Sequence, residues 1–128
     1  MPTGEPAVEY LREGGWLLVR CSPGTGGVEW LLALLSATNE HLAGEPASAV
    51  LIDAREVSAV ISTAGRFRVG ERAAASWFGP PLALVGAMSL VDPERFGEEV
   101  ARSRGLDVRV FTDIDEATNW LRTRAVTR

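Results

Sequence analysis

The side chains able to carry out acid–base, nucleophilic or metal chemistry are few in this chain of 128 residues. It has one histidine, His41, one cysteine, Cys21, and no lysine among its 13 basic residues. His41 is the only conventional base that could activate a nucleophile, and no Gly-x-Ser-x-Gly elbow accompanies it. A single histidine and a single cysteine, far apart in the sequence, lack the spacing of metal ligands. We therefore predict a protein that is not an enzyme and that has no metal and no cofactor.

A glycine-rich segment, residues 23–27 (Pro-Gly-Thr-Gly-Gly), lies between a predicted strand and a predicted helix. Free backbone N–H groups and the helix dipole can hold an anion at such a place. A Walker loop requires a lysine, which the chain lacks, and a dinucleotide fingerprint requires glycine where Glu29 stands. A flexible loop is therefore favoured over a phosphate cradle.

Asp53 ends a buried strand, at the edge of the sheet where ligands bind in open α/β folds. The simplest interpretation is that its side chain starts a turn through residues 54–57. The alternative is that Asp53 and Arg55 contribute to a surface that binds a partner or a ligand.

Short apolar runs alternate along the chain with longer segments of helical periodicity. Gly14 and Gly15 favour a tight hairpin turn between the first two strands, and Asp92, Pro93 and Gly105 mark the ends of the third helix. Strands are predicted at residues 7–11, 16–22, 49–53, 82–87 and 108–111, and helices at 28–42, 63–78, 93–104 and 113–121.

This alternation predicts an α/β fold with a mixed, mostly parallel sheet of about five strands, an N-terminal β-hairpin and about four helices. Residues 7–122 are predicted to form one domain. Residues 1–6 are expected to be a flexible N-terminus, and residues 123–128 a frayed basic tail.

The charge balance argues against a nucleic-acid partner, because the formal net charge is −4 and the pI is about 5.0. One cysteine permits no internal disulfide. The N-terminus lacks the basic and apolar regions of a signal peptide, and no apolar run approaches the roughly 20 residues that a transmembrane helix needs. We therefore expect a cytoplasmic protein with no transmembrane segment.

The first predicted helix has two apolar rows and only a narrow polar stripe. Its core face is predicted to hold Val28, Leu31, Leu32, Leu35 and Leu42. A second row contains Trp30, Leu34, Ala37 and His41. Because such a helix normally keeps one side in water, the second row is predicted to meet a partner: a second copy of the chain, another protein or a lipid.

The second predicted helix places an apolar stripe on one face, interpreted as core: Phe67, Gly70, Ala74, Trp77 and Phe78. Ser62 is a predicted N-cap, with Thr63 in the first turn. Three arginines, Arg66, Arg68 and Arg72, surround the start of this helix. A phosphate on Thr63 or Ser62 would be stabilised there, although plain capping by Ser62 is the simpler interpretation.

The order of the elements resembles the SpoIIAA-like (STAS/SEC14) family, in particular its stand-alone bacterial members, over about residues 7–121. The resemblance is strongest at residues 50–57 (Val-Leu-Ile-Asp-Ala-Arg-Glu-Val) and 105–121 (Gly-Leu-Asp-Val-Arg-Val-Phe-Thr-Asp-Ile-Asp-Glu-Ala-Thr-Asn-Trp-Leu). It implies a small α/β domain similar to anti-sigma-factor antagonists and to lipid-binding SEC14 domains. In the antagonists, an Asp-Ser-Ser/Thr-Gly motif at the start of the second helix holds the phosphorylated hydroxyl. The resemblance places Thr63 at that position, with Ile61 in place of the acid and Ala64 in place of the glycine.

Two functions from different classes follow. The first is a non-catalytic regulatory or interaction domain that binds a protein partner, or itself as a homodimer, through residues 62–72 and the second row of the first helix. The alternative is a SEC14-like binder of lipid or another small apolar ligand, with the first helix and residues 77–81 (Trp-Phe-Gly-Pro-Pro) as a lid or membrane-touching edge.

Overall fold

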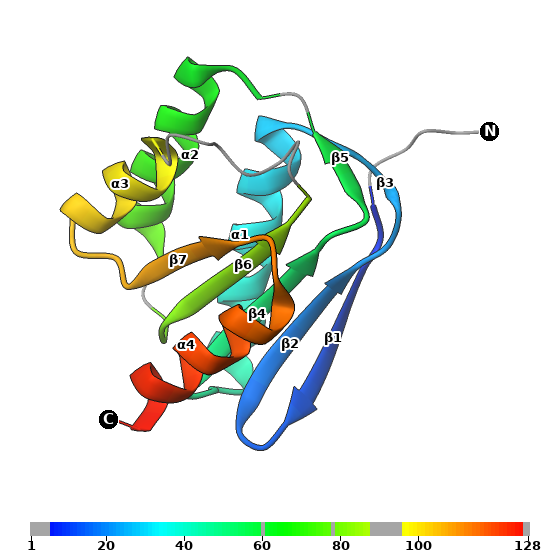
Figure 1. The fold of residues 1–128 in the computed structure, drawn as a ribbon, viewed down its shortest axis with the longest axis vertical. Helices are drawn as coiled ribbons and strands as arrows, with labels where there is room; N and C mark the ends of the chain where they lie inside the picture. The colour runs from blue at the N-terminus through cyan, green and yellow to red at the C-terminus, as the bar shows by residue number, and fades with distance from the viewer. Residues whose placement is uncertain (1–5, 60, 78, 88–95, 127–128) are drawn as a thin grey trace.

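A five-stranded sheet runs through the centre of the molecule (Figure 1). The structure is a computed structural model and describes residues 6–59, 61–77, 79–87 and 96–126. The strand order is β1-β2-β4-β6-β7; β1 is antiparallel to β2, and the other pairs are parallel. The predicted mixed, mostly parallel sheet is confirmed. Its strands are β1 (Val8–Glu13), β2 (Trp16–Cys21), β4 (Ala49–Ala54), β6 (Leu82–Gly86) and β7 (Val108–Phe111).

The turn between β1 and β2 uses the glycines that the sequence indicated. Gly14 has φ +57° and Gly15 has φ +87°. A two-residue hairpin needs positive φ at both positions to match the twist of its strands, and glycine adopts that conformation without steric cost. The predicted hairpin is therefore confirmed.

The glycine-rich segment is not the loop that the sequence predicted. Residues Gly24–Gly26 form strand β3, which pairs in parallel with β5 (Val57–Ala59) in a separate two-stranded sheet. Gly26 is buried beneath an aromatic ring, since a Cβ at this position would lie 2.5 Å from Cε3 of Trp30. The missing side chain of Gly26 thus makes room for tryptophan.

Helices cover the two faces of the sheet unequally. Helices α1 (Val28–Gly44), α2 (Thr63–Ser76) and α3 (Phe96–Ser103) lie on one face, and α4 (Ile114–Val126) lies on the other (Figure 1). The predicted start of the third helix at Asp92 and Pro93 lies outside the described residues. Its predicted end is confirmed: Gly105 has φ +97°, and its N–H donates to the Arg102 carbonyl at 3.0 Å.

The C-terminal segment departs from the prediction, because α4 continues past Leu121 to Val126. Arg124 accounts for this extension, since its Nε donates to Oδ2 of Asp107 at 3.0 Å and its guanidinium lies over the Trp120 ring. The expectation of a frayed tail from residue 123 is wrong as far as Val126.

Two apolar clusters, one on each face of the sheet, form the core. On the three-helix face, the β2 residues Leu17 and Val19 and the β4 residue Ile52 are buried against α1. On the other face, Leu51 of β4 packs with Leu121 of α4. Because β4 is covered on both sides, its sequence reads as a nearly continuous apolar run.

Candidate functional site

Helix α2 begins at an exposed N-cap. The Oγ of Ser62 accepts a hydrogen bond from the backbone N–H of Gly65 at 3.0 Å, so the predicted cap is confirmed. Thr63, the first residue of the helix, is exposed, and the first turn contains no acidic residue. The positive end of the α2 dipole and the Thr63 hydroxyl therefore share one solvent-facing position.

Phe67 lies one turn further along α2 and faces solvent, contrary to the prediction that it is part of a core stripe. Its residue surface is 37% exposed, and the Arg104 guanidinium lies 5.7 Å from the ring centroid. The reason is the close packing of α2 on α3. Gly70 is buried where a Cβ would collide with the backbone of Gly97, so the inner side of α2 is the one that carries its small residues.

The three arginines predicted around the start of α2 do not form one group. Arg68 and Arg72 are exposed, and Nη1 of Arg68 lies 2.9 Å from Oε2 of Glu29, at the start of α1. Arg66 instead lines a cavity on the inner side of the helix. We call Ser62, Thr63, Phe67, Arg68 and Arg72 the outer surface of α2.

Asp53 and Arg55 form a pair within one turn. Nε of Arg55 lies 2.9 Å from Oδ1 of Asp53, Nη2 lies 2.8 Å from Oδ2, and the Arg55 backbone N–H also donates to Oδ1. These side-chain hydrogen bonds lower the pKa of Asp53, with a further contribution from the charge of Arg20. The predicted turn is confirmed, and both carboxylate oxygens of Asp53 are occupied within the chain.

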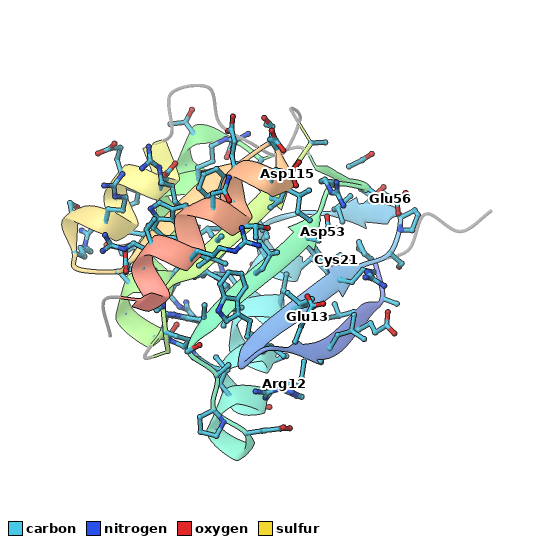
Figure 2. All side chains as sticks on the ribbon, turned by 60° about the horizontal axis from the view of Figure 1, so that its bottom comes forward. Arg12, Glu13, Cys21, Asp53, Glu56 and Asp115 are labelled. Atoms are coloured by element: carbon cyan, nitrogen blue, oxygen red, sulfur yellow. The ribbon has the colours of Figure 1, made fainter. Side chains whose placement is uncertain are left out.

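The same end of the sheet holds the cysteine. Figure 2 shows Glu56 and Asp115 on the same side of the molecule as Asp53, near Cys21. Burial, and secondly the charge of Asp53, raises the pKa of the Cys21 thiol to about 11. Because the thiolate is the reactive form, a thiol with this pKa is a poor nucleophile at neutral pH.

The prediction that the second row of the first helix meets a partner is wrong for Trp30 and Leu34, because both side chains are buried. Trp30 is 6% exposed and Leu34 is 4% exposed. Helix α1 packs against both the sheet and α2, which covers Trp30 and Leu34, whereas Ala37 of the same row is exposed. His41 from the same row stacks on Tyr10 of β1, with ring centroids 4.4 Å apart.

The prediction that residues 77–81 form a lid or a membrane-touching edge is wrong at Trp77. This side chain is 5% exposed and is part of the core, and its Nε1–H donates to the Pro80 carbonyl at 3.0 Å. A buried, hydrogen-bonded indole cannot serve as an exposed membrane-touching edge. Phe78, the other aromatic residue of this prediction, lies outside the described residues.

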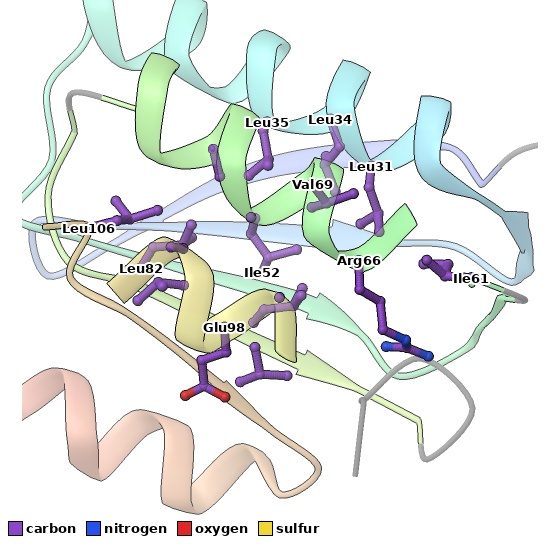
Figure 3. Close-up of a pocket in the computed structure, with 17 residues that line it drawn as sticks. Leu31, Leu34, Leu35, Ile52, Ile61, Arg66, Val69, Leu82, Glu98 and Leu106 are labelled. Atoms are coloured by element: carbon purple, nitrogen blue, oxygen red, sulfur yellow. The ribbon is translucent and has the colours of Figure 1, made fainter. Parts of the chain in front are cut away.

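A cavity that the sequence analysis missed lies between α1, α2, α3 and the sheet (Figure 3). It has a volume of about 120 Å³. Among the 17 described residues that line it, Arg66 and Glu98 carry charged side chains, and the others are aliphatic residues or glycine. A signal was present in the sequence, because each helix carries a pair of small residues on one face. Gly70 and Ala73 are three residues apart on α2, and Gly97 and Ala101 are four residues apart on α3.

In the part of the chain that the structure describes, no group of three or more His, Cys, Asp or Glu residues is placed to hold a metal ion. No described helix has the length and apolar character needed to cross a membrane.

Comparison with solved structures gives the class of fold: the architecture is SpoIIAA-like. The chain is similar to the crystal structure of an anti-sigma factor antagonist from Mycobacterium paratuberculosis, with a TM-score of 0.64 and 14% sequence identity over 95% of this chain and 97% of that chain. It is also similar to an uncharacterized DUF3478 protein with a SpoIIAA-like fold from Shewanella loihica PV-4, with a TM-score of 0.51 and 20% identity over 91% and 94% of the two chains. No protein-family model matches the sequence, and no curated protein does either. The predicted SpoIIAA-like fold is confirmed.

Proposed function

We propose that the chain is a non-catalytic regulatory domain that binds a protein partner through the outer surface of α2. The observation that carries this proposal is the position of Phe67. Among the described residues, it is the large apolar side chain that stands exposed, and it lies between the Thr63 hydroxyl and two exposed arginines on the same helix.

The composition of this surface suits protein recognition. Aromatic residues, phenylalanine among them, and arginine are enriched at protein interfaces, because the rings supply a large apolar area and arginine supplies directional hydrogen bonds. Burial of the Phe67 ring would supply the apolar contact, and Arg68 and Arg72 would meet carboxylates of the partner. The similarity to an anti-sigma factor antagonist supports a role in protein binding.

Thr63 is the proposed point of regulation on this surface. Its side chain is exposed at the first position of the helix, whereas the Ser62 oxygen already accepts a hydrogen bond as the N-cap. A phosphate on Thr63 would add up to two negative charges beside Phe67 and at the positive end of the helix dipole. It would change the charge that the surface presents to a partner without requiring a change of fold.

The test is site-specific photo-crosslinking in the organism that encodes the chain. A photoreactive phenylalanine analogue is introduced at Phe67, and as the matched control at Asn119, an exposed position of α4 on the opposite face of the sheet. We expect one protein to be crosslinked from position 67 and not from position 119. Equal crosslinking of the same protein from both positions, or no crosslinked protein from position 67, would overturn the proposal.

The alternative of a SEC14-like binder of lipid or another small apolar ligand loses Trp77 as part of its lid, because this side chain is buried, whereas Leu31 and Leu34 of the first helix line a cavity. What favours a ligand of any kind is the cavity beneath α2. Native mass spectrometry of freshly purified protein tests for a bound lipid. A measured mass equal to that of the chain alone would argue against the alternative, and a larger mass would support it.

A further inference from the structure

The cavity lies on the side of α2 opposite to its outer surface. Side chains from three helices and three strands surround it, and Figure 3 shows how the helices bring them together above the sheet. The aliphatic lining includes Leu31 and Leu34 of α1, Val69 of α2, and Ile52, Leu84 and Val110 of the strands.

Small residues on facing helices leave this space unfilled. Gly70 of α2 and Gly97 of α3 bring the two helix backbones together, and a Cβ on Gly97 would lie 2.8 Å from the Arg66 carbonyl oxygen. The neighbouring positions, Ala73 and Ala101, also line the cavity and are too short to fill it. The two helices are therefore held close to each other without their side chains covering the strands below.

The strand side of the cavity has the corresponding gap. Leu84 lies on β6, which has β4 on one side and β7 on the other, yet its side chain is only partly buried. The adjacent Val110 on β7 is also partly buried, although both residues face the helices. A sheet position covered by close-packed helices would be fully buried, so the space over these two residues is available to a ligand.

Two charged side chains, Arg66 and the buried Glu98, also line the cavity. Figure 3 shows the Arg66 guanidinium and the Glu98 carboxylate pointing away from Leu34 and Leu35. Oε2 of Glu98 also lies 3.9 Å from Nη1 of Arg102. Water in a cavity needs two to four polar partners, and among the described lining residues only Arg66 and the buried Glu98 carry polar side chains.

We propose that this cavity binds one small, uncharged, apolar molecule, about the size of a single aromatic ring or a short alkyl group. The predominance of aliphatic side chains in the described lining sets the charge, since a buried polar group without a partner is costly. The volume sets the size: an apolar cavity of about 150 Å³ accepts benzene, and two acyl chains of a phospholipid need far more space. This site does not depend on a protein partner at the outer surface of α2.

The test is thermal unfolding of the full chain with benzene as the probe. A ligand that binds only the folded state raises the melting temperature in proportion to the logarithm of its concentration above the dissociation constant. We expect benzene to raise the melting temperature by a few degrees, in step with the logarithm of its concentration, and vesicles of phosphatidylcholine to leave it unchanged. No rise of the melting temperature with benzene, or a rise with the vesicles alone, would overturn the proposal.

A matched pair of variants on one helix locates the site. Ala73→Leu fills the cavity and should abolish the shift with benzene, whereas Ala75→Leu makes the same change at an exposed position and should keep it. If Ala73→Leu fails to fold, the wild-type chain still gives the answer by NMR. Nuclear Overhauser effects from benzene to the methyl groups of Leu31 and Leu84 are expected. Effects confined to the methyl groups of Leu11, on the far strand β1, would contradict the proposed site.

Discussion

Helix α2 carries its largest apolar side chain, Phe67, on the side facing solvent, and its smallest residues, Gly70 and Ala73, on the side facing the sheet. A surface helix ordinarily places large aliphatic residues inward and polar residues outward. The inner side of α2 makes close contact with α3 but leaves a cavity. The outer side leaves an aromatic ring partly exposed to solvent. This comparison indicates that both sides of the helix depart from simple core packing, and that each has space for a molecule other than this chain.

The largest effect is expected from closing the contact between α2 and α3. Gly70→Val would push a branched side chain into the backbone of Gly97 and should lower the free energy of unfolding by about 3 kcal/mol. Ala75→Val, at an exposed position of the same helix, should cost less than about 1 kcal/mol. Urea unfolding measures both values, and equal costs would show that the inner side of α2 is not tightly packed at Gly70.

The opposite sign is expected when the cavity is filled. An enclosed core void of about 120 Å³ would correspond to about 3 kcal/mol of lost packing, and because this cavity is partly open, that figure is an upper bound. Ala73→Leu fills the space and recovers part of this packing energy. The recovery is only partial because the new side chain loses rotamer freedom on burial, so the free energy of unfolding should rise by about 1 kcal/mol. Destabilisation by this variant in urea unfolding would mean that the inner side of α2 cannot accept further side-chain volume.

An intermediate effect is expected at the N-cap. Ser62→Ala removes the acceptor of the Gly65 N–H and should lower the free energy of unfolding by about 1 kcal/mol. Thr63→Ala is the natural control, because Thr63 is exposed and is not the cap; it should cost less than about 0.5 kcal/mol. Thermal melting compares the two variants, and an equal loss at Thr63 would argue against its being a free surface position.

The smallest effect on stability is expected from the outer side. Phe67→Ala removes a ring that is 37% exposed, and the better helix propensity of alanine offsets part of the lost burial and of the lost contact with Arg104. The free energy of unfolding should fall by no more than about 1 kcal/mol. A loss above about 2 kcal/mol would make Phe67 a structural residue and would remove the contrast between the two sides of α2.

The fold could be predicted from the sequence where local chemistry decides the structure. The paired glycines of the hairpin turn, the Ser62 cap and the apolar runs of the central strands each determine their own conformation. The strand β3 could not be predicted in this way, because its pairing with β5 joins segments about 30 residues apart. Such pairing depends on the tertiary arrangement and leaves no periodic pattern in a three-residue segment.

The candidate site was predicted in part, for a related reason. The start of α2 was found correctly, since capping is local. The direction in which each side chain points was wrong for Phe67, Trp30 and Leu34, because it depends on where the neighbouring helices pack. Glycine at positions 26 and 70 decides these contacts, and a helical wheel that counts only apolar side chains assigns glycine no such role.

The most direct measurement uses the partner protein that crosslinking from position 67 identifies. The purified partner is titrated calorimetrically, in separate experiments, with the wild-type chain and with Phe67→Ala. An aromatic residue at the centre of an interface typically contributes enough that its truncation weakens binding more than tenfold. We predict a more than tenfold loss of affinity in Phe67→Ala, with the melting temperature lowered by no more than a few degrees. Asn119→Ala should keep full affinity. Equal affinities of the wild-type chain and Phe67→Ala would contradict the assignment of the outer surface of α2 as the binding surface.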